Sequence, residues 1–135
     1  MSETRYLAVK VVMMPRDTNP YGTIFGGVIM SYIDQAGAVG ARYTIQQQGF
    51  PAQPLVTIAM ESVEFHEPVL VGDTVSFWTE MRRIGRSSIT MHVSVETERD
   101  RQLRRVTQAD VTYVAIRLDG KHRRPVPIAG SQDER

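Results

Sequence analysis

One long helix pattern, followed by four strand patterns, constrains the fold of this sequence more than any other feature. Residues 26–47 contain no proline, and their apolar residues recur at helical spacing, which predicts a single α-helix. At about 1.5 Å per residue this helix is about 33 Å long, enough to cross a whole domain. Few of its side chains are polar, so other parts of the chain must enclose most of its surface.

Strand patterns on both sides of the helix can provide that enclosure. A first strand is predicted over residues 5–14, before a loop rich in turn-forming residues. Apolar and polar residues alternate in four segments after the helix, and short turns join these segments, which predicts an antiparallel meander. The four strands are expected at residues 54–66, 73–84, 87–98 and 104–118.

This order of elements excludes a parallel β/α fold, because a single helix cannot supply the crossovers that five strands would need. We expect an α+β fold in which a curved antiparallel sheet of five to six strands wraps around the long central helix. The chain of 135 residues fits one domain. We place this domain at residues 1–128 and a polar C-terminal tail at 129–135.

Composition narrows the classes of function. With 16 basic and 15 acidic residues, the net charge of +1 gives no general attraction to nucleic acid or to an anionic membrane. The sequence has no cysteine, and its three histidines lack metal-ligand spacing, so neither a metal nor a cofactor is expected. No apolar run approaches the ~20 residues of a membrane span, and no leader pattern is visible. We therefore expect a cytoplasmic protein.

The start of the predicted helix is a candidate oxyanion site. Gly26 and Gly27 stand there, and Thr23 is the only side chain ahead of them that could cap the helix. Amides in the first turn of a helix lack intrahelical partners and carry partial positive charge. Two glycines would let a substrate carbonyl reach these amides. The alternative is that the glycines let the helix pack closely on the sheet.

Two polar residues near the helix start are candidates for chemistry. Asp34 lies two turns into the helix, on the same side as Gly27, and a partly desolvated carboxylate there could act as a general base. The alternative places Asp34 in a solvated polar stripe. Asn19, which precedes Pro20, could orient a water or a carbonyl, whereas turn chemistry is the simpler interpretation.

A predicted hairpin turn is a candidate phosphate site. It contains Gly85, Arg86, Ser87 and Ser88. A guanidinium, two hydroxyls and turn amides together suit a phosphate or a pyrophosphate. As a bare hairpin turn the segment needs no function. Two further arginines, at positions 123 and 124, fall in a segment for which a solvated tail is the simpler interpretation.

The run NPYGTIFGGVIMSYIDQAG at residues 19–37 resembles the hotdog-fold acyl-CoA thioesterases of the bacterial acyl-CoA hydrolase family. Further matches are ESVEFHEPVLVGD at 61–73 and GRSSI at 85–89, and the likeness covers roughly residues 8–128. The resemblance implies a hotdog fold and a homodimer whose sheets join edge to edge. It also implies further assembly into a trimer of dimers, with the active site between subunits.

The same resemblance implies roles for the candidate residues. Asp34 would be the catalytic carboxylate, Asn19 would contribute from the facing subunit, and the amide of Gly27 would polarise the thioester carbonyl. The Gly85–Ser88 turn would contact coenzyme A. The expected activity is hydrolysis of acyl-CoA to a free fatty acid and coenzyme A, with Asp34 either activating water or attacking as a nucleophile. The alternative is a hotdog module that binds acyl-CoA without turnover. Neither nucleic acid nor a membrane is expected as a partner.

Overall fold

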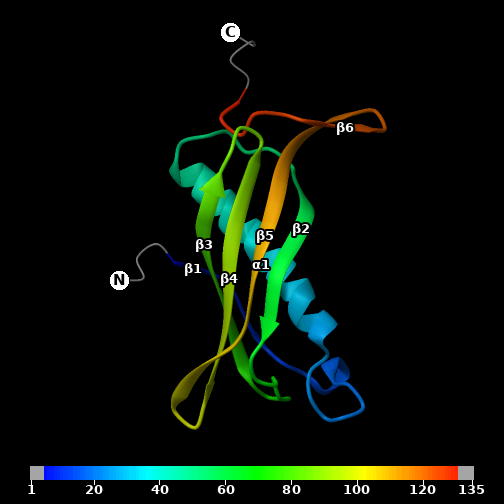
Figure 1. Ribbon diagram of the computed structural model, residues 1–135, viewed down its shortest axis with the longest axis vertical. Coiled ribbons are helices and arrows are strands. Elements are labelled where there is room, and N and C mark those ends of the chain that lie inside the picture. Colours follow the sequence, from blue (N-terminus) through cyan, green and yellow to red (C-terminus); the bar gives the residue numbers. More distant parts are fainter. Residues whose placement is uncertain (1–4, 131–135) are drawn as a thin grey trace.

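One long helix, α1 (Gly26–Gln47), lies against one face of an antiparallel sheet in the computed structural model, which describes residues 5–130 (Figure 1). A short 3-10 helix, η1 (Pro15–Asp17), precedes it. The strands are β1 (Tyr6–Val12), β2 (Leu55–Phe65), β3 (Thr74–Ile84), β4 (Ser88–Arg99), β5 (Gln102–Asp119) and β6 (His122–Pro125). The α+β class and the bounds predicted for the long helix are confirmed.

The strand order of the sheet is β1-β3-β4-β5-β2, and β6 pairs with the end of β5. The predicted meander is therefore correct for β3, β4 and β5 but wrong for β2, which pairs with β5 instead of β3. Beyond β2 the amide of His66 still donates to the carbonyl of Val106 over 2.8 Å. The chain then crosses to β1, where the amide of Gly72 donates to Met13 over 2.9 Å. Residues 66–73 thus form a crossover rather than a hairpin.

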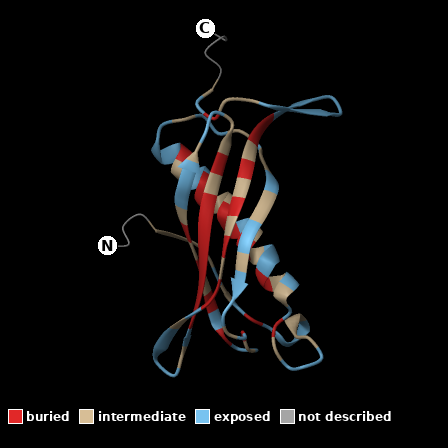
Figure 2. Cartoon of the chain, in the orientation of Figure 1, coloured by how far each residue is buried: buried red, intermediate tan, exposed pale blue. Residues whose placement is uncertain are grey.

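The core lies between α1 and the sheet, and the strands in the middle of the sheet carry most of the buried residues (Figure 2). Every second residue of β4 from Ile89 to Val95 is fully buried against the helix, as the alternation in the sequence predicts. The helix residues that face them are Ile29, Ile33, Ala36, Gly37, Gly40, Ala41 and Ile45. This buried stripe fixes which side of α1 remains available for a site.

Two glycines in the middle of α1 set its distance from the sheet. A Cβ atom on Gly37 would overlap the hydroxyl of Tyr113, and one on Gly40 would overlap the side chain of Thr79. A Cβ atom on Gly27 would have nothing within 4 Å. At the helix start, a Cβ atom on Gly26 would lie 3.3 Å from the ring of Phe65, so the close-packing interpretation holds for Gly26, whereas Gly27 is left open.

The segment after β6 covers the end of the sheet where α1 ends. The amide of Val126 donates to Ala115, and that of Ile128 donates to Arg86, over 2.9 and 2.8 Å. Ile128 is buried in the core. The chain is therefore packed into the domain up to this residue, and most of the predicted tail, residues 131–135, lies outside the described residues.

Candidate active site

Asp34 lies on the side of α1 that faces the edge strand β2. The hydroxyl of Thr57, on β2, donates a hydrogen bond of 2.6 Å to Oδ1 of Asp34. Both residues line an open groove of about 340 Å³, together with Leu55 and Arg42. Among the ion pairs of residues 5–130, none includes Asp34. Its carboxylate therefore keeps lone pairs available for a further donor such as water.

The backbone at Asp34 is anchored from beneath by Tyr113 of β5. The phenol donates a hydrogen bond of 2.6 Å to the carbonyl oxygen of Asp34, in the space that Gly37 leaves by having no side chain. Burial is the main cause that raises the pKa of Tyr113, and the charge and the hydrogen bond of Asp34 raise it further. The phenol therefore remains a donor at neutral pH and holds this turn of the helix on the sheet.

Thr57 was not a candidate in the sequence, although it contacts the predicted carboxylate directly. Threonine is common in strands, and the register of β2 with β5 shifts just after this residue. Only the packing of the edge strand beside α1 brings its hydroxyl to Asp34. A polar residue among apolar neighbours in that strand was the one available signal.

The start of α1 offers open amides, as the sequence predicts. Phe25 is the N-cap, and no side chain caps the helix. The amide of Phe25 donates to Asp17, and those of Val28 and Ile29 donate to Phe25. Gly26 and Gly27 stand between Phe25 and Val28. Among the hydrogen bonds of the described part of the chain, none uses the amide of either glycine. This first turn can therefore accept an anion or a polarised carbonyl oxygen.

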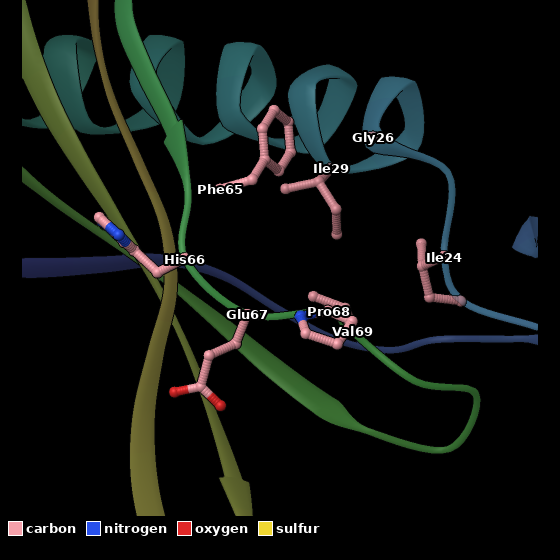
Figure 3. Close-up of a pocket in the computed structure, with 8 residues that line it drawn as sticks. All are labelled: Ile24, Gly26, Ile29, Phe65, His66, Glu67, Pro68 and Val69. Carbon is pink, nitrogen blue, oxygen red and sulfur yellow. The ribbon is translucent and has the colours of Figure 1, made fainter.

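A mostly apolar hollow of about 360 Å³ adjoins the helix start (Figure 3). Figure 3 shows the ring of Phe65 beneath the first turn, beside Ile29, while His66 and Glu67 point away from the helix. The ring lies where a side chain on Gly26 would be, at 3.3 Å from its Cβ position. The hollow suits an aliphatic group, because its other lining residues are Ile24, Pro68 and Val69.

Asn19 organises the loop that leads into α1. Its Oδ1 accepts hydrogen bonds from the amides of Tyr21 and Thr23 over 2.9 and 3.1 Å, and its Nδ2 donates to the hydroxyl of Thr23 over 2.8 Å. These contacts form the turn that was the simpler interpretation of this residue. Within one chain Asn19 lies before the helix and is not among the residues that line the groove at Asp34.

The Gly85–Ser88 turn joins β3 to β4 at the end of the sheet where α1 ends, opposite the helix start (Figure 1). The amide of Gly85 donates to Ser88, and the carbonyl of Ser87 accepts from Ala115, both over 2.8 Å. The side chain of Arg86 is exposed and lines a wide groove beside β6. The turn is thus a rigid part of the sheet with an arginine projecting from it.

Within one chain these candidates occupy separate places. The hollow at Gly26 and the groove at Asp34 share no lining residue. The Gly85–Ser88 turn lies at the other end of the helix from Gly27 (Figure 1). Asp34 and the helix-start amides, which were predicted to lie on the same side of the helix, therefore do not face one common pocket on the surface of a single chain.

Other features of the described residues bear on the class of site. Residues 5–130 hold no cluster of three His, Asp or Glu side chains that could bind a metal. His92 instead lies on the sheet face away from α1, where its Nδ1 is 2.7 Å from the carboxylate of Asp110. No helix in this part of the chain is long and apolar enough to cross a bilayer.

The sequence matches the model of the thioesterase superfamily over residues 21–104. An uncharacterized acyl-CoA thioester hydrolase of Haemophilus influenzae is 36% identical over 132 residues, which cover 94% of this chain and 81% of that protein. The acyl-CoA thioester hydrolase YciA of Salmonella typhimurium is 35% identical over 129 residues, which cover 92% of each chain. The similarity therefore spans nearly the whole chain in each case.

Solved structures show the same architecture. A hexameric hotdog fold thioesterase of Campylobacter jejuni superposes with a TM-score of 0.79 at 39% identity, over 94% of this chain and 91% of that one. The acyl-CoA hydrolase of Staphylococcus aureus, solved with butyryl coenzyme A and coenzyme A, superposes with a TM-score of 0.73 at 28% identity, over 94% of this chain and 74% of that one. The hotdog fold implied by the sequence resemblance is confirmed.

Proposed function

Because the chain belongs to the thioesterase superfamily and is a hydrolase of acyl-CoA thioesters, we propose that Asp34 is its general base and that the amide of Gly27 binds the thioester oxygen. The observation that carries this proposal is the carboxylate of Asp34, held by Thr57 on the wall of an open groove. The alternative of binding without turnover is set aside, because the relatives over the whole chain are named as hydrolases.

The chemistry needs only a base, an oxyanion donor and a bound acyl group. Asp34 takes a proton from water while the water oxygen attacks the thioester carbon, and the carbonyl electron pair moves onto oxygen. The amide of Gly27 stabilises that oxyanion. When the tetrahedral intermediate collapses, the carbon–sulfur bond breaks and the thiolate of coenzyme A takes the proton from Asp34. The products are a carboxylic acid and free coenzyme A.

The complete site is proposed to form between two copies of the chain. β2 is an edge strand, and its Ile58 is 60% exposed, as expected for a strand that pairs with another chain. Pairing of two β2 edges would extend the sheet and bring Asn19 and the helix-start amides of the partner subunit toward Asp34. The separation of these groups within one chain supports this arrangement. Further assembly into a trimer of dimers is part of the same proposal, and the hexameric thioesterase of Campylobacter jejuni supports it.

The two polar candidates have counterparts in a relative. Structures of the Staphylococcus aureus hydrolase include variants in which one asparagine, one threonine or one aspartate is replaced by alanine. That asparagine and that aspartate are separated by the same number of positions as Asn19 and Asp34. This spacing supports a role for both residues. Contact of coenzyme A with the Gly85–Ser88 turn belongs to the same proposal, and a cytoplasmic location stays a prediction.

Replacing Asp34 tests the proposed base. We expect Asp34→Ala to lower kcat by about 100-fold or more, the scale on which a general base contributes, with the melting temperature retained. Release of coenzyme A is followed with a thiol reagent, to which this cysteine-free chain adds no background. Glu98→Ala, which removes an exposed carboxylate of β4, is the matched control and leaves kcat unchanged. A folded Asp34→Ala protein with undiminished turnover contradicts the proposal.

A single-turnover reaction in water labelled with oxygen-18 separates the two roles that the sequence left open for Asp34. A general base leaves its own carboxylate unlabelled, whereas nucleophilic attack forms an anhydride, and water that attacks the Asp34 carbonyl of this anhydride brings the label into Asp34. Mass spectrometry of the peptide that contains Asp34 reads the outcome. Label in that peptide would contradict the role of Asp34 as a general base and indicate that Asp34 attacks the thioester as a nucleophile.

A further inference from the structure

Tyr21, in the loop before α1, is the most exposed of the large apolar side chains of residues 5–130, with 89% of its surface accessible. None of the hydrogen bonds or ring contacts among these residues involves its side chain. Two further aromatic residues near the helix start, Phe25 and Phe65, are 49% and 52% exposed. Exposed apolar side chains that gather in one region are typical of a surface that another molecule covers.

The turn that carries Tyr21 is anchored to Asn19. The amide of Tyr21 donates to Oδ1 of Asn19 over 2.9 Å, and the amide of Gly22 donates to the carbonyl of Asn19 over 3.2 Å. The amide of Asn19 donates to the carbonyl of Thr23 over 2.7 Å, which closes the turn. The φ angle of 86° at Gly22 favours glycine there. The ring of Tyr21 therefore projects from a fixed base and moves only with Asn19.

The side chain of Asn19 has little hydrogen-bonding capacity left. Its Oδ1 accepts from the amides of Tyr21 and Thr23, and its Nδ2 donates to the hydroxyl of Thr23. Because an asparagine side chain has two donor hydrogens and two acceptor lone pairs, a single N–H remains. A molecule that faces this loop therefore meets that N–H and, beside it, the ring of Tyr21.

The groove at Asp34 is open on its outer side. Its lining residues come from α1, β2 and β5, and its apolar surface is formed by Ala38, Val39 and Leu55. In the proposed pairing of two β2 edges, Asn19 of one chain approaches Asp34 of the other. The turn then brings Tyr21 to the same place, opposite the apolar surface. A large ring with a polar tip suits a groove that is partly apolar and partly polar.

We propose that Tyr21 of one subunit covers the groove at Asp34 of the other and contacts the acyl group beside the thioester carbonyl. The inference rests on the proposed function and extends it, because it adds a residue that selects acyl groups across the subunit boundary. The carbonyl carbon lies near Asp34 when water attacks it, so the ring meets the carbon next to the carbonyl. Tyr21 takes no part in proton transfer. It determines which acyl groups fit and keeps bulk water out of the groove.

Two isomeric substrates test the contact with the acyl group. Butyryl-CoA and isobutyryl-CoA differ only in a branch at the carbon next to the carbonyl, where the ring is placed. We expect the wild type to favour butyryl-CoA by about tenfold in kcat/KM, a discrimination that one misplaced methyl group allows. Tyr21→Ala should lower kcat/KM for butyryl-CoA by about tenfold and bring the two substrates close to parity. Tyr21→Phe keeps the ring and should keep the wild-type preference.

Leu103→Ala is the matched control, since Leu103 is an exposed apolar residue at the start of β5. It should leave both substrates unaffected. An unchanged rate and an unchanged preference in Tyr21→Ala would overturn the assignment. Gel filtration accompanies each variant. Elution of Tyr21→Ala as a smaller species than the wild type would also overturn it, because the ring would then hold the subunits together instead of covering the substrate.

Mixed assemblies test whether the ring acts across the boundary. Chains with Asp34→Ala and chains with Tyr21→Ala are coexpressed with different tags, and assemblies that carry both tags are purified. In a mixed dimer one of the two sites combines an intact Asp34 with the Tyr21 of the other chain, so kcat/KM should rise toward half of the wild-type value. A mixture no more active than Tyr21→Ala alone would show that the ring acts within its own chain, and the assignment would be wrong.

A second pair of variants separates this inference from the proposed function. Asp34→Ala mixed in the same way with Asn19→Ala reports on the shared site without changing Tyr21. Recovery of activity in both mixtures supports the assignment. Recovery with Asn19→Ala but not with Tyr21→Ala would overturn the role of Tyr21 and leave the shared site standing. Recovery in neither mixture would contradict the shared site itself, and the inference with it.

Discussion

Asp34 and Asp73 are both aspartates that contact the sheet, but their carboxylates have opposite surroundings. Asp73 is only 8% exposed, and it accepts hydrogen bonds from the guanidinium of Arg99 and from the amide of Leu70. The carboxylate of Asp34 accepts a hydrogen bond from the hydroxyl of Thr57 and faces an open groove. A carboxylate whose lone pairs are filled by fixed donors serves the fold, whereas one with free acceptor sites can bind and activate water.

The charge of Asp73 is stabilised by its partners. Burial pushes the pKa of Asp73 upward, but the hydrogen bonds from Arg99 and Leu70 and the charge of Arg99 outweigh it, so the pKa lies below its usual 3.8. Because the folded-state pKa is lowered, the stabilisation is complete above the unfolded-state pKa and is lost as the pH falls through the folded-state value. Asp73 therefore contributes to stability at neutral pH.

The largest effect is expected when this ion pair is broken. Asp73→Asn should lower the free energy of unfolding by about 2 kcal/mol at pH 7, since Arg99 then faces a neutral partner. The deficit should narrow as the pH falls below about 4, where the wild-type carboxylate also becomes neutral. Urea unfolding at several pH values measures both effects. The folded variant should retain wild-type kcat, in contrast to Asp34→Ala.

The reverse pattern would break the comparison between the two aspartates. A normal stability together with a large loss of kcat in Asp73→Asn would place that residue in catalysis. Asp110→Asn is unsuitable as a control, because Asp110 is partly buried and His92 and Arg82 contact it. Glu98→Asn, at an exposed position of β4, is the better control. It should change neither the free energy of unfolding nor kcat.

A smaller effect is expected at the donor that holds Asp34. Thr57→Val keeps the shape of the side chain but removes the hydrogen bond, so we expect kcat to fall by about tenfold, as loss of about 1.4 kcal/mol of positioning implies. Thr57→Ser keeps the donor and should restore most of the rate. Since Thr57 is exposed, both variants should melt at the wild-type temperature. Equal kcat values for the Val and Ser variants would show that the hydroxyl does not position Asp34.

Local patterns were sufficient for most of the fold. The apolar period of α1 and the absence of proline predict Gly26–Gln47, and the structure has the same bounds. The alternation in β4 identifies its buried face. Both features depend on neighbours close in sequence, where periodicity carries the information.

Pairings between distant segments were not accessible in the same way. The short segment between β2 and β3 reads as a turn, but hydrogen bonds to Val106 and Met13 make it a crossover. Strand β6 was not separated from the tail, because its residues, HRRP, lack alternation and pair only with the end of β5. Thr57 was missed for the same reason, since the placement of an edge strand beside the helix is a property of the whole sheet.

The smallest effect is expected beneath the helix backbone. Tyr113→Phe removes the hydrogen bond to the carbonyl of Asp34, which also lies within the helix, so we expect a loss of about 1 kcal/mol in the free energy of unfolding. Chemical denaturation measures it. Tyr43→Phe, at a half-exposed ring stacked on Tyr6, is the matched control and should change nothing. If kcat falls with Tyr113→Phe while stability does not, the phenol positions the Asp34 carboxylate instead of fastening the helix, and Asp34 would then depend on a fixed donor as Asp73 does.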